Sequence, residues 1–339
     1  MSTNASATVE RVRSAYADDL CILAHHYQND TVVRHADVVG DSLELARRIP
    51  DLQARNIVLC GVFFMAESAA ILARPGQKVF IPVFQAGCPL ADMAPADLVE
   101  QAVHELNVGP DRVAPLAYVN SSAAVKAVCG RHGGTVCTSA NAVRMLQWLQ
   151  GQSEAVLFLP DGNLGENSAD RLGLPRESRR LLDLKERISP EPGVSLYLWP
   201  GNCHVHQNIR PDHIRSVRSN RPGVQVIVHP ECSPEVVSLA DASGSTSQII
   251  AFVREAPKHS CIAVGTEEHL VRRLARQYEG QKEILPLCAA ECPDMAAITE
   301  ESLAELLETL PDRQPVTVDD DTRMLARTAL DRMLQAVSG

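Results

Sequence analysis

Short apolar runs recur along the whole chain, and each is followed by polar residues and then by a segment with helical spacing. Runs of roughly 4–8 apolar residues without strict alternation are typical of parallel strands that helices cover on both faces. Strands that alternate with helices in this way predict an α/β protein. The predicted strands are residues 20–24, 56–62, 78–83, 113–117, 155–159, 194–199, 224–228, 261–264 and 283–287.

The same order of elements occurs three times, each time with a serine at a predicted helix start and a cysteine after a later strand. The interval between them is 46 residues in the first unit and 47 in the third, whereas a polar insertion at 170–190 lengthens the second to 64. The pairs are Ser42 and Cys88, Ser139 and Cys203, and Ser245 and Cys292. We therefore expect three homologous three-layer α/β/α domains with small parallel sheets, in a pseudo-threefold arrangement around a central site. The expected domains are 1–97, 98–209 and 210–339, the last with an amphipathic C-terminal helix at 322–337.

Composition narrows the class of protein. The chain has 339 residues, of which 45% are hydrophobic and 22% charged, as in ordinary globular proteins. It contains no apolar run of about 18 residues and no basic segment followed by an apolar one near its start, so we expect a cytoplasmic protein without a membrane span. A net charge of -10 argues against nucleic-acid binding, although helix N-termini can still hold small anionic substrates.

The chain has ten cysteines. Because we expect a cytoplasmic protein, they do not indicate a disulfide framework. One cysteine from each unit could converge on a common axis, namely Cys88, Cys203 and Cys292. In the third unit Cys288 competes with Cys292, but it lies only 43 residues after Ser245 and matches the first unit less well. Three thiolates can hold a [4Fe–4S] cluster and leave one iron open, or they can bind zinc together with a water or His206. The spacing alone leaves both alternatives open.

A second group of candidates is formed by hydroxyl residues at predicted helix starts, namely Ser42, Ser139, Ser245 and Thr246. The free backbone N–H groups and the positive end of the dipole favour anions at such positions. Plain N-capping explains any single one of them equally well. Three equivalent starts around one axis would instead form a pocket for a substrate with several negative groups.

A third group lies at the ends of the first strand of each unit. Carboxyl ends of parallel strands meet at one edge of a sheet, where open α/β proteins place their chemistry. These side chains would bring an acid, a base and hydrogen-bond donors together, although each could also be a satisfied core residue. The group comprises His25, Tyr27, Tyr118, Asn120, His229 and Glu231.

Specific motifs accompany these candidates along nearly the whole chain. They are AHHYQ at 24–28, GDSLELA at 40–46, GVFFMAE at 61–67, AGC at 86–88, YVN at 118–120, TSAN at 138–141, WPGNC at 199–203, HPEC at 229–232, GSTS at 244–247, GTE at 265–267 and CPDM at 292–295. In these motifs the chain resembles the quinolinate synthase family of bacterial NAD biosynthesis.

The resemblance implies a transferase that condenses iminosuccinate with dihydroxyacetone phosphate to quinolinate, phosphate and water, with L-aspartate oxidase as the source of iminosuccinate. It implies a non-redox [4Fe–4S] cluster where the three domains meet, with Cys88, Cys203 and Cys292 as ligands and one open iron as Lewis acid. Tyr27, His229 and Glu231 would be catalytic. The residues expected around the substrates are His25, Ser42, Tyr118, Val119, Asn120, Ser139, His229, Pro230, Glu231, Ser245 and Thr246.

Two other functions fit the same residues. A different cluster-dependent hydro-lyase would share the open iron and the anion pocket, and an iron–sulfur sensor would bind a partner instead of a substrate. Some relatives carry a Cys-x-x-Cys-x-x-Cys run near the third ligand. Here only Cys288 and Cys292 stand in this region, which argues against a regulatory disulfide.

Overall fold

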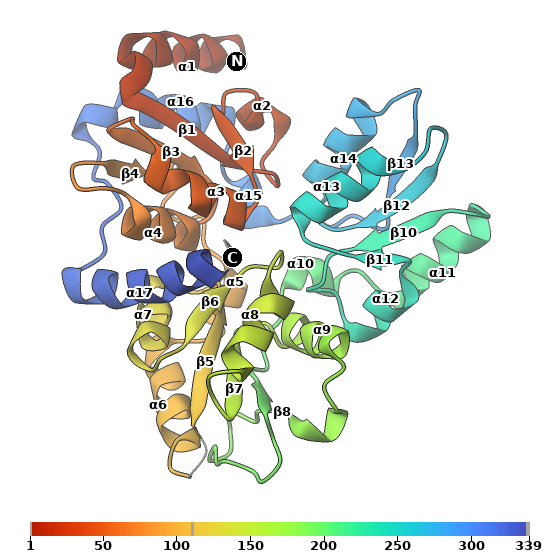
Figure 1. Ribbon diagram of the computed structural model, residues 1–339. Coiled ribbons are helices and arrows are strands. Elements are labelled where there is room, and N and C mark those ends of the chain that lie inside the picture. Colours follow the sequence, from red (N-terminus) through yellow and green to blue (C-terminus); the bar gives the residue numbers. More distant parts are fainter. Residues whose placement is uncertain (1, 110–111, 337–339) are drawn as a thin grey trace.

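The computed structural model describes residues 2–109 and 112–336, which form three separate β-sheets with helices packed around them (Figure 1). Every strand pair in the described part of the chain is parallel. The predicted α/β class with three small parallel sheets is therefore confirmed. Among these residues, no helix combines the length and the apolar character that crossing a membrane requires.

The first sheet has the strand order β2-β1-β3-β4. Strand β1 is buried along its whole length, because it pairs with a strand on each side. Strand β4 ends at Phe80, earlier than the predicted 78–83, and Pro82 beyond it has no N–H to donate to a neighbouring strand. The elements are β1 Leu20–His25, β2 Val38–Gly40, β3 Asn56–Cys60, β4 Lys78–Phe80, α2 Asp30–Val33, α3 Ser42–Arg48 and α4 Phe63–Leu72.

The second sheet has the order β6-β5-β7-β9-β8. Its fifth strand, β8, comes from the polar insertion at 170–190 and pairs with β9 at the edge of the sheet. The insertion therefore extends the sheet and accounts for the longer interval between Ser139 and Cys203. The elements are β5 Val113–Tyr118, β6 Thr135–Cys137, β7 Ala155–Leu159, β8 Arg179–Leu181, β9 Leu196–Leu198, α6 Ala96–Leu106, α7 Ala123–Arg131, α8 Ala142–Gln150 and α9 Gly162–Leu172.

The third sheet, in the order β11-β10-β12-β13, has the same arrangement of successive strands as the first. The second sheet follows this order too, apart from its added edge strand. The threefold repeat in the sequence is thus a repeat of sheet topology. The elements are β10 Gln225–Val228, β11 Ala242–Ser243, β12 Cys261–Gly265, β13 Glu283–Pro286, α11 Pro211–Asn220, α12 Pro234–Leu239, α13 Thr246–Glu255 and α14 Glu268–Gln277.

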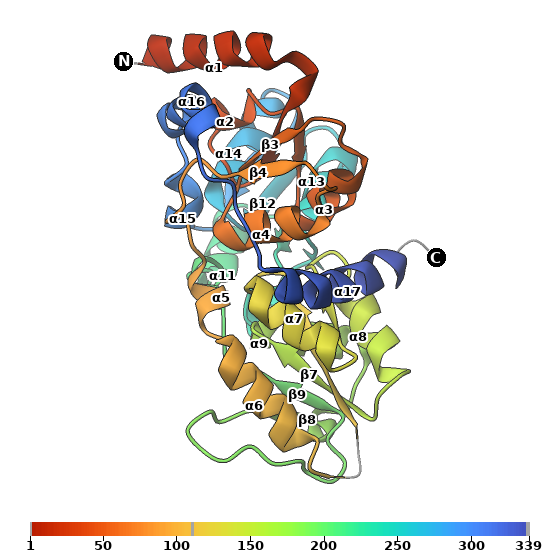
Figure 2. The same ribbon diagram turned by 90° about the vertical axis from the view of Figure 1, so that its left-hand side faces the viewer.

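The segment after Cys292 leaves the third sheet and returns to the other two (Figures 1 and 2). Helix α16 (Glu300–Glu308) lies beside α1 (Ser2–Tyr16), and its Leu303 and Leu306 share a core with Val9 of α1. Helix α17 (Asp320–Ala336) lies along α7 and contacts α4. These helices belong by sequence to the expected unit 210–339, but their apolar faces are buried on the first and second sheets.

The predicted C-terminal helix at 322–337 is observed as α17, although position 337 lies outside the described residues. Its buried face includes Ala329 and Leu330. The side chain of Arg327 donates hydrogen bonds to the carbonyl oxygens of Ile71 (3.1 Å) and Leu72 (3.2 Å) at the end of α4. Helix α17 thereby ties the first sheet to the second.

Candidate functional site

A cavity of about 70 Å³ lies where the carboxyl ends of strands from all three sheets meet. This volume exceeds what a single water needs and suits a small ligand. Three of the predicted site residues do not line it: Val119, Pro230 and Ser245. The predicted residues that do line it are His25, Tyr27, Ser42, Cys88, Tyr118, Asn120, Ser139, Cys203, His229, Glu231, Thr246 and Cys292.

The three cysteines occupy equivalent local positions. Each is the N-cap of a one-turn helix and has no side-chain cap hydrogen bond: Cys88 before α5 (Pro89–Asp92), Cys203 before α10 (His204–Gln207) and Cys292 before α15 (Pro293–Ala296). Each thus begins a turn whose first N–H groups have no intrahelical partner and point toward the sulfur. Cys288 does not line the cavity, and its Sγ lies 3.7 Å from the carbonyl oxygen of Asn208.

The three thiols lie in surroundings that disfavour their charged form. Burial raises the pKa of Cys88 to about 12 and that of Cys292 to about 11, and it raises the pKa of Cys203 well above the ordinary value. Backbone N–H groups of the three short helices lower these pKa values only in part. A bound metal deprotonates a coordinating thiol outright. Without such an ion, burial favours the neutral thiol form of all three cysteines.

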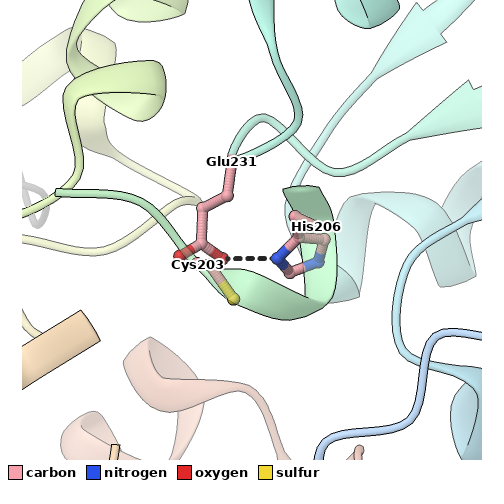
Figure 3. A group of neighbouring side chains, drawn as sticks. All are labelled: Cys203, His206 and Glu231. Atoms are coloured by element: carbon pink, nitrogen blue, oxygen red, sulfur yellow. Dashed lines mark ion pairs between the residues drawn. The ribbon is translucent and has the colours of Figure 1, made fainter. Parts of the chain in front are cut away.

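Glu231 contacts two histidine rings, of which Figure 3 shows that of His206. Its Oε2 lies 3.1 Å from Nδ1 of His229 and 3.2 Å from Nδ1 of His206, and the two rings stack with centroids 4.4 Å apart. Burial alone raises the pKa of Glu231, but His206 and His229 outweigh it and lower this pKa. Burial also lowers the pKa of His229. Glu231 and His229 therefore combine an ionised carboxylate with an imidazole whose neutral form is favoured.

The same carboxylate belongs to a group that could hold a metal. Ligand atoms of Cys203, His206 and Glu231 all lie within 4.8 Å of one another. Figure 3 shows Cys203 and His206 on one short helix, with Glu231 reaching toward them from the loop after β10. Sequence analysis named His206 only as a zinc ligand. Its spacing of three residues from Cys203, one helical turn, was the signal that it shares the site.

Several buried polar atoms around the cavity find no hydrogen-bond partner in the described part of the chain. Native proteins pair nearly all such atoms with protein groups, water or a bound ion or ligand, so this cluster marks a polar cavity that one of these occupies. Asp161, which caps α9, is buried beside Glu231, and burial raises its pKa well above the ordinary value. The atoms near the site without a hydrogen bond include Asn120 Oδ1, Asp161 Oδ2, His204 Nε2 and Glu231 Oε1, and also His206 Nδ1, whose contact with Glu231 is an ion pair only.

The structure shows which residue caps the helix at each of these predicted starts. Asp41, not Ser42, caps α3, so that Ser42 is its first residue, and Asn141 caps α8, so that Ser139 lies in the turn before it. Ser245 caps α13 and accepts a hydrogen bond from the N–H of Gln248, which leaves Thr246 to face the cavity. Ser245 therefore acts as a plain cap.

Tyr27 connects the first sheet to the third across the cavity. Its hydroxyl lies 2.7 Å from the hydroxyl of Thr266 and accepts a hydrogen bond from Thr246 at 3.3 Å. Thr266 in turn lies 3.2 Å from Nε2 of His206. Burial raises the pKa of Tyr27 well above its ordinary value, and it lowers the pKa of His25, whose ring meets Tyr27 edge-on, to about 3. Thr266 was missed as a site residue, although it lies within a recognised motif.

The fold and this site define an α/β protein in which three units together line a cavity with cysteine, histidine and carboxylate side chains. A family model described as "Quinolinate synthetase A protein" matches residues 7–335. A curated protein named quinolinate synthase from Acidobacterium capsulatum is 43% identical, over 96% of this chain and 92% of the relative. One from Halalkalibacterium halodurans is also 43% identical, over 93% of this chain and 89% of the relative. Another from Lysinibacillus sphaericus is 40% identical, over 98% and 93%. The chain belongs to the quinolinate synthase family.

Proposed function

We propose that this protein is a quinolinate synthase, a transferase that joins iminosuccinate to dihydroxyacetone phosphate and releases quinolinate, phosphate and water. Its place would be in NAD biosynthesis, downstream of an L-aspartate oxidase that supplies iminosuccinate. The observation that carries the proposal is one cavity lined by cysteines from three units together with Tyr27 and Glu231. Family membership supports it independently.

We propose Cys88, Cys203 and Cys292 as the residues that would hold a [4Fe–4S] cluster. Their equivalent positions and the unpaired polar atoms nearby support this assignment. When bound, such a cluster with one open iron supplies a Lewis acid that promotes loss of water. The competing assignment is a zinc ion that uses Cys203 and His206, and the metal content of the purified protein distinguishes the two.

Two helix starts are suited to the negative groups of the substrates. Ser42 opens α3 and Thr246 opens α13, and both residues line the cavity. The N–H groups of Leu43 and Glu44 already donate to Asp41, and that of Gln248 donates to Ser245. The hydroxyls of Ser42 and Thr246, and the dipole and first N–H groups of α13, would therefore bind carboxylates or the phosphate. Ser139 and Asn120 would add hydrogen bonds from the second unit. The leaving phosphate would then depart from a site that favours its charge.

Proton transfer is assigned to Glu231, His229 and Tyr27. A carboxylate kept ionised by two neighbouring imidazoles can accept a proton from substrate carbon or nitrogen. The Tyr27 hydroxyl, whose pKa is raised by burial, stays protonated and would donate a hydrogen bond to a developing negative oxygen. These groups would serve the isomerisation of the keto sugar phosphate and the closure of the ring.

The test is an anaerobic assay with iron-loaded protein, dihydroxyacetone phosphate and iminosuccinate generated in place by L-aspartate oxidase. We expect quinolinate and phosphate to form in equal amounts. Phosphate release without quinolinate, or no reaction at all, would refute the proposal.

A further inference from the structure

Arg273 of α14 reaches from the third unit to the loop that follows β1 in the first. Its Nη1 donates to the carbonyl oxygen of Gln28 at 3.0 Å and contacts Oδ1 of Asp30 at 2.8 Å, and its Nη2 donates to the carbonyl oxygen of His26. The side chain is 19% exposed. One guanidinium therefore binds two carbonyl groups of the loop and the first residue of α2, which follows it.

Two of these acceptors flank Tyr27 directly. The carbonyl groups of His26 and Gln28 stand on either side of it in the chain, so fixing both restricts the backbone of Tyr27. The hydroxyl end of Tyr27 is held by Thr266 and Thr246, which also belong to the third unit. Thr266 immediately follows β12 and lies shortly before α14. The same unit thus holds both ends of the tyrosine.

We propose that Arg273 is a positioning residue that sets the orientation of the Tyr27 ring in the cavity. This inference rests on the proposed function only insofar as Tyr27 takes part in the reaction. The planar fork of arginine can serve two carbonyl groups and a carboxylate together, whereas the ammonium of lysine acts as a single point charge. Replacing Arg273 would remove its hydrogen bonds to the loop and leave Tyr27 itself unchanged.

Helix α14 also supplies a matched control. Arg272, the neighbouring residue, is 61% exposed and pairs with Glu268 of its own helix at 3.0 Å. Arg272→Gln removes the same charge from the same helix without touching the loop. Any effect of charge or helix stability alone would appear in both variants, whereas an effect on Tyr27 would appear only with Arg273→Gln.

The first readout is independent of activity. The full-length protein has five tyrosines, and 3-fluorotyrosine labelling gives each a fluorine resonance. Tyr27→Phe assigns the resonance of Tyr27 by its disappearance. We expect Arg273→Gln to shift this resonance, Arg273→Lys to shift it less, and Arg272→Gln to leave it unchanged. An unchanged Tyr27 resonance in Arg273→Gln would overturn the proposal. If Arg273→Gln shifts all five resonances, the fold itself is disturbed, and Arg273→Lys replaces it in the test. An unchanged Tyr27 resonance in Arg273→Lys would then overturn the proposal.

The second readout is kinetic. We expect Arg273→Gln to lower kcat about 10- to 100-fold with little change in KM, the size of effect that a small misplacement of a reacting group produces. In a Tyr27→Phe background the same substitution should lower kcat by less than about twofold, since the residues act as one unit. Equal losses in both backgrounds would overturn the proposal. If the wild-type protein forms no quinolinate, the proposed function fails, but the fluorine spectra still decide the role of Arg273.

Discussion

The hydroxyl oxygens of Tyr27 and Thr266 lie 2.7 Å apart, although 239 residues separate them in the chain. Each follows a strand of its own sheet, β1 in the first and β12 in the third. The cavity is thus made from equivalent strand ends of repeated units, which places a residue of one unit within hydrogen-bonding distance of another. Tyr27 is partly buried, and the ring of His25 packs against it edge-on.

Removing the hydroxyl of Tyr27 should reduce catalysis more than stability. In Tyr27→Phe we expect kcat/KM for quinolinate formation to fall by about 10- to 100-fold, because a hydrogen-bond donor to the reacting groups is lost. The ring packs on two apolar clusters and should keep the fold intact. Tyr278→Phe is the control, since Tyr278 packs under Lys282 and does not line the cavity. Similar kinetics for both variants would argue against a catalytic Tyr27.

Glu231→Gln should stop turnover while iron is retained. The substitution keeps the shape of the side chain but removes its charge and its ability to accept a proton, which is worth about 10²–10⁴-fold in rate. Iron content and quinolinate formation should be measured on the same preparation. A wild-type rate would remove Glu231 from the mechanism. Loss of metal together with activity would instead favour a metal held by Cys203, His206 and Glu231.

Single Cys→Ser substitutions should separate the cavity cysteines from Cys288. We expect Cys88→Ser, Cys203→Ser and Cys292→Ser to lose most of the bound iron and sulfide, because a hydroxyl is a poor replacement for a thiolate ligand. Cys288→Ser should retain both, since its sulfur lies outside the cavity lining. Iron and sulfide analysis after anaerobic reconstitution is the measurement. Iron loss in Cys288→Ser would contradict the choice of Cys292.

Glu44 should make the stability of the fold depend on pH. Hydrogen bonding from His26, aided by the N–H of Asp41, lowers the pKa of Glu44 from 4.5 to about 2. Because the pKa is lower in the folded state, the ionised group stabilises the fold above pH 4.5, and this contribution is lost as the pH falls toward about 2. Glu44→Gln should lower the free energy of unfolding at pH 7 by about 0.5 kcal/mol, since the carboxylate is partly exposed.

Urea unfolding of Glu44→Gln and wild type at several pH values between 7 and about 3 tests this dependence. The difference between them should shrink as the solution becomes more acidic. Glu186→Gln, at an exposed position, is the control and should show no such trend. A difference that stays constant with pH would contradict the assigned role of the Glu44 charge.

The contact between α7 and α17 should depend on Gly130. A Cβ at this position would lie 1.9 Å from the carbonyl oxygen of Leu325, so Gly130→Ala must push α17 away. We expect a loss of about 1–3 kcal/mol in the free energy of unfolding, the usual cost of overpacking, and faster proteolysis of the C-terminal helix. Gly151→Ala is the control, because its nearest neighbour would lie at 3.4 Å. Equal stability of the two variants would contradict this packing.

Much of the fold followed from local pattern. Strands buried on both faces need continuous apolar runs, so the runs predicted the parallel strands, and their threefold recurrence predicted three sheets. The three cavity cysteines were candidates because each follows a strand, and in the first and third units the interval from the serine also matches. Such a pattern can be predicted without knowing how side chains pack, because it depends only on which residues are apolar and on their order.

Other features were decided only by tertiary packing. Helix α16 covers the first sheet instead of the third, Ser245 is a cap while Thr246 faces the cavity, and Arg273 holds the loop of Tyr27. Each depends on where one segment meets another far away in the chain and on the direction of its side chains. Local hydrophobic spacing does not tell which distant segments meet or which side chains then face each other. An apolar helix face can pack equally well on any exposed apolar surface of suitable shape.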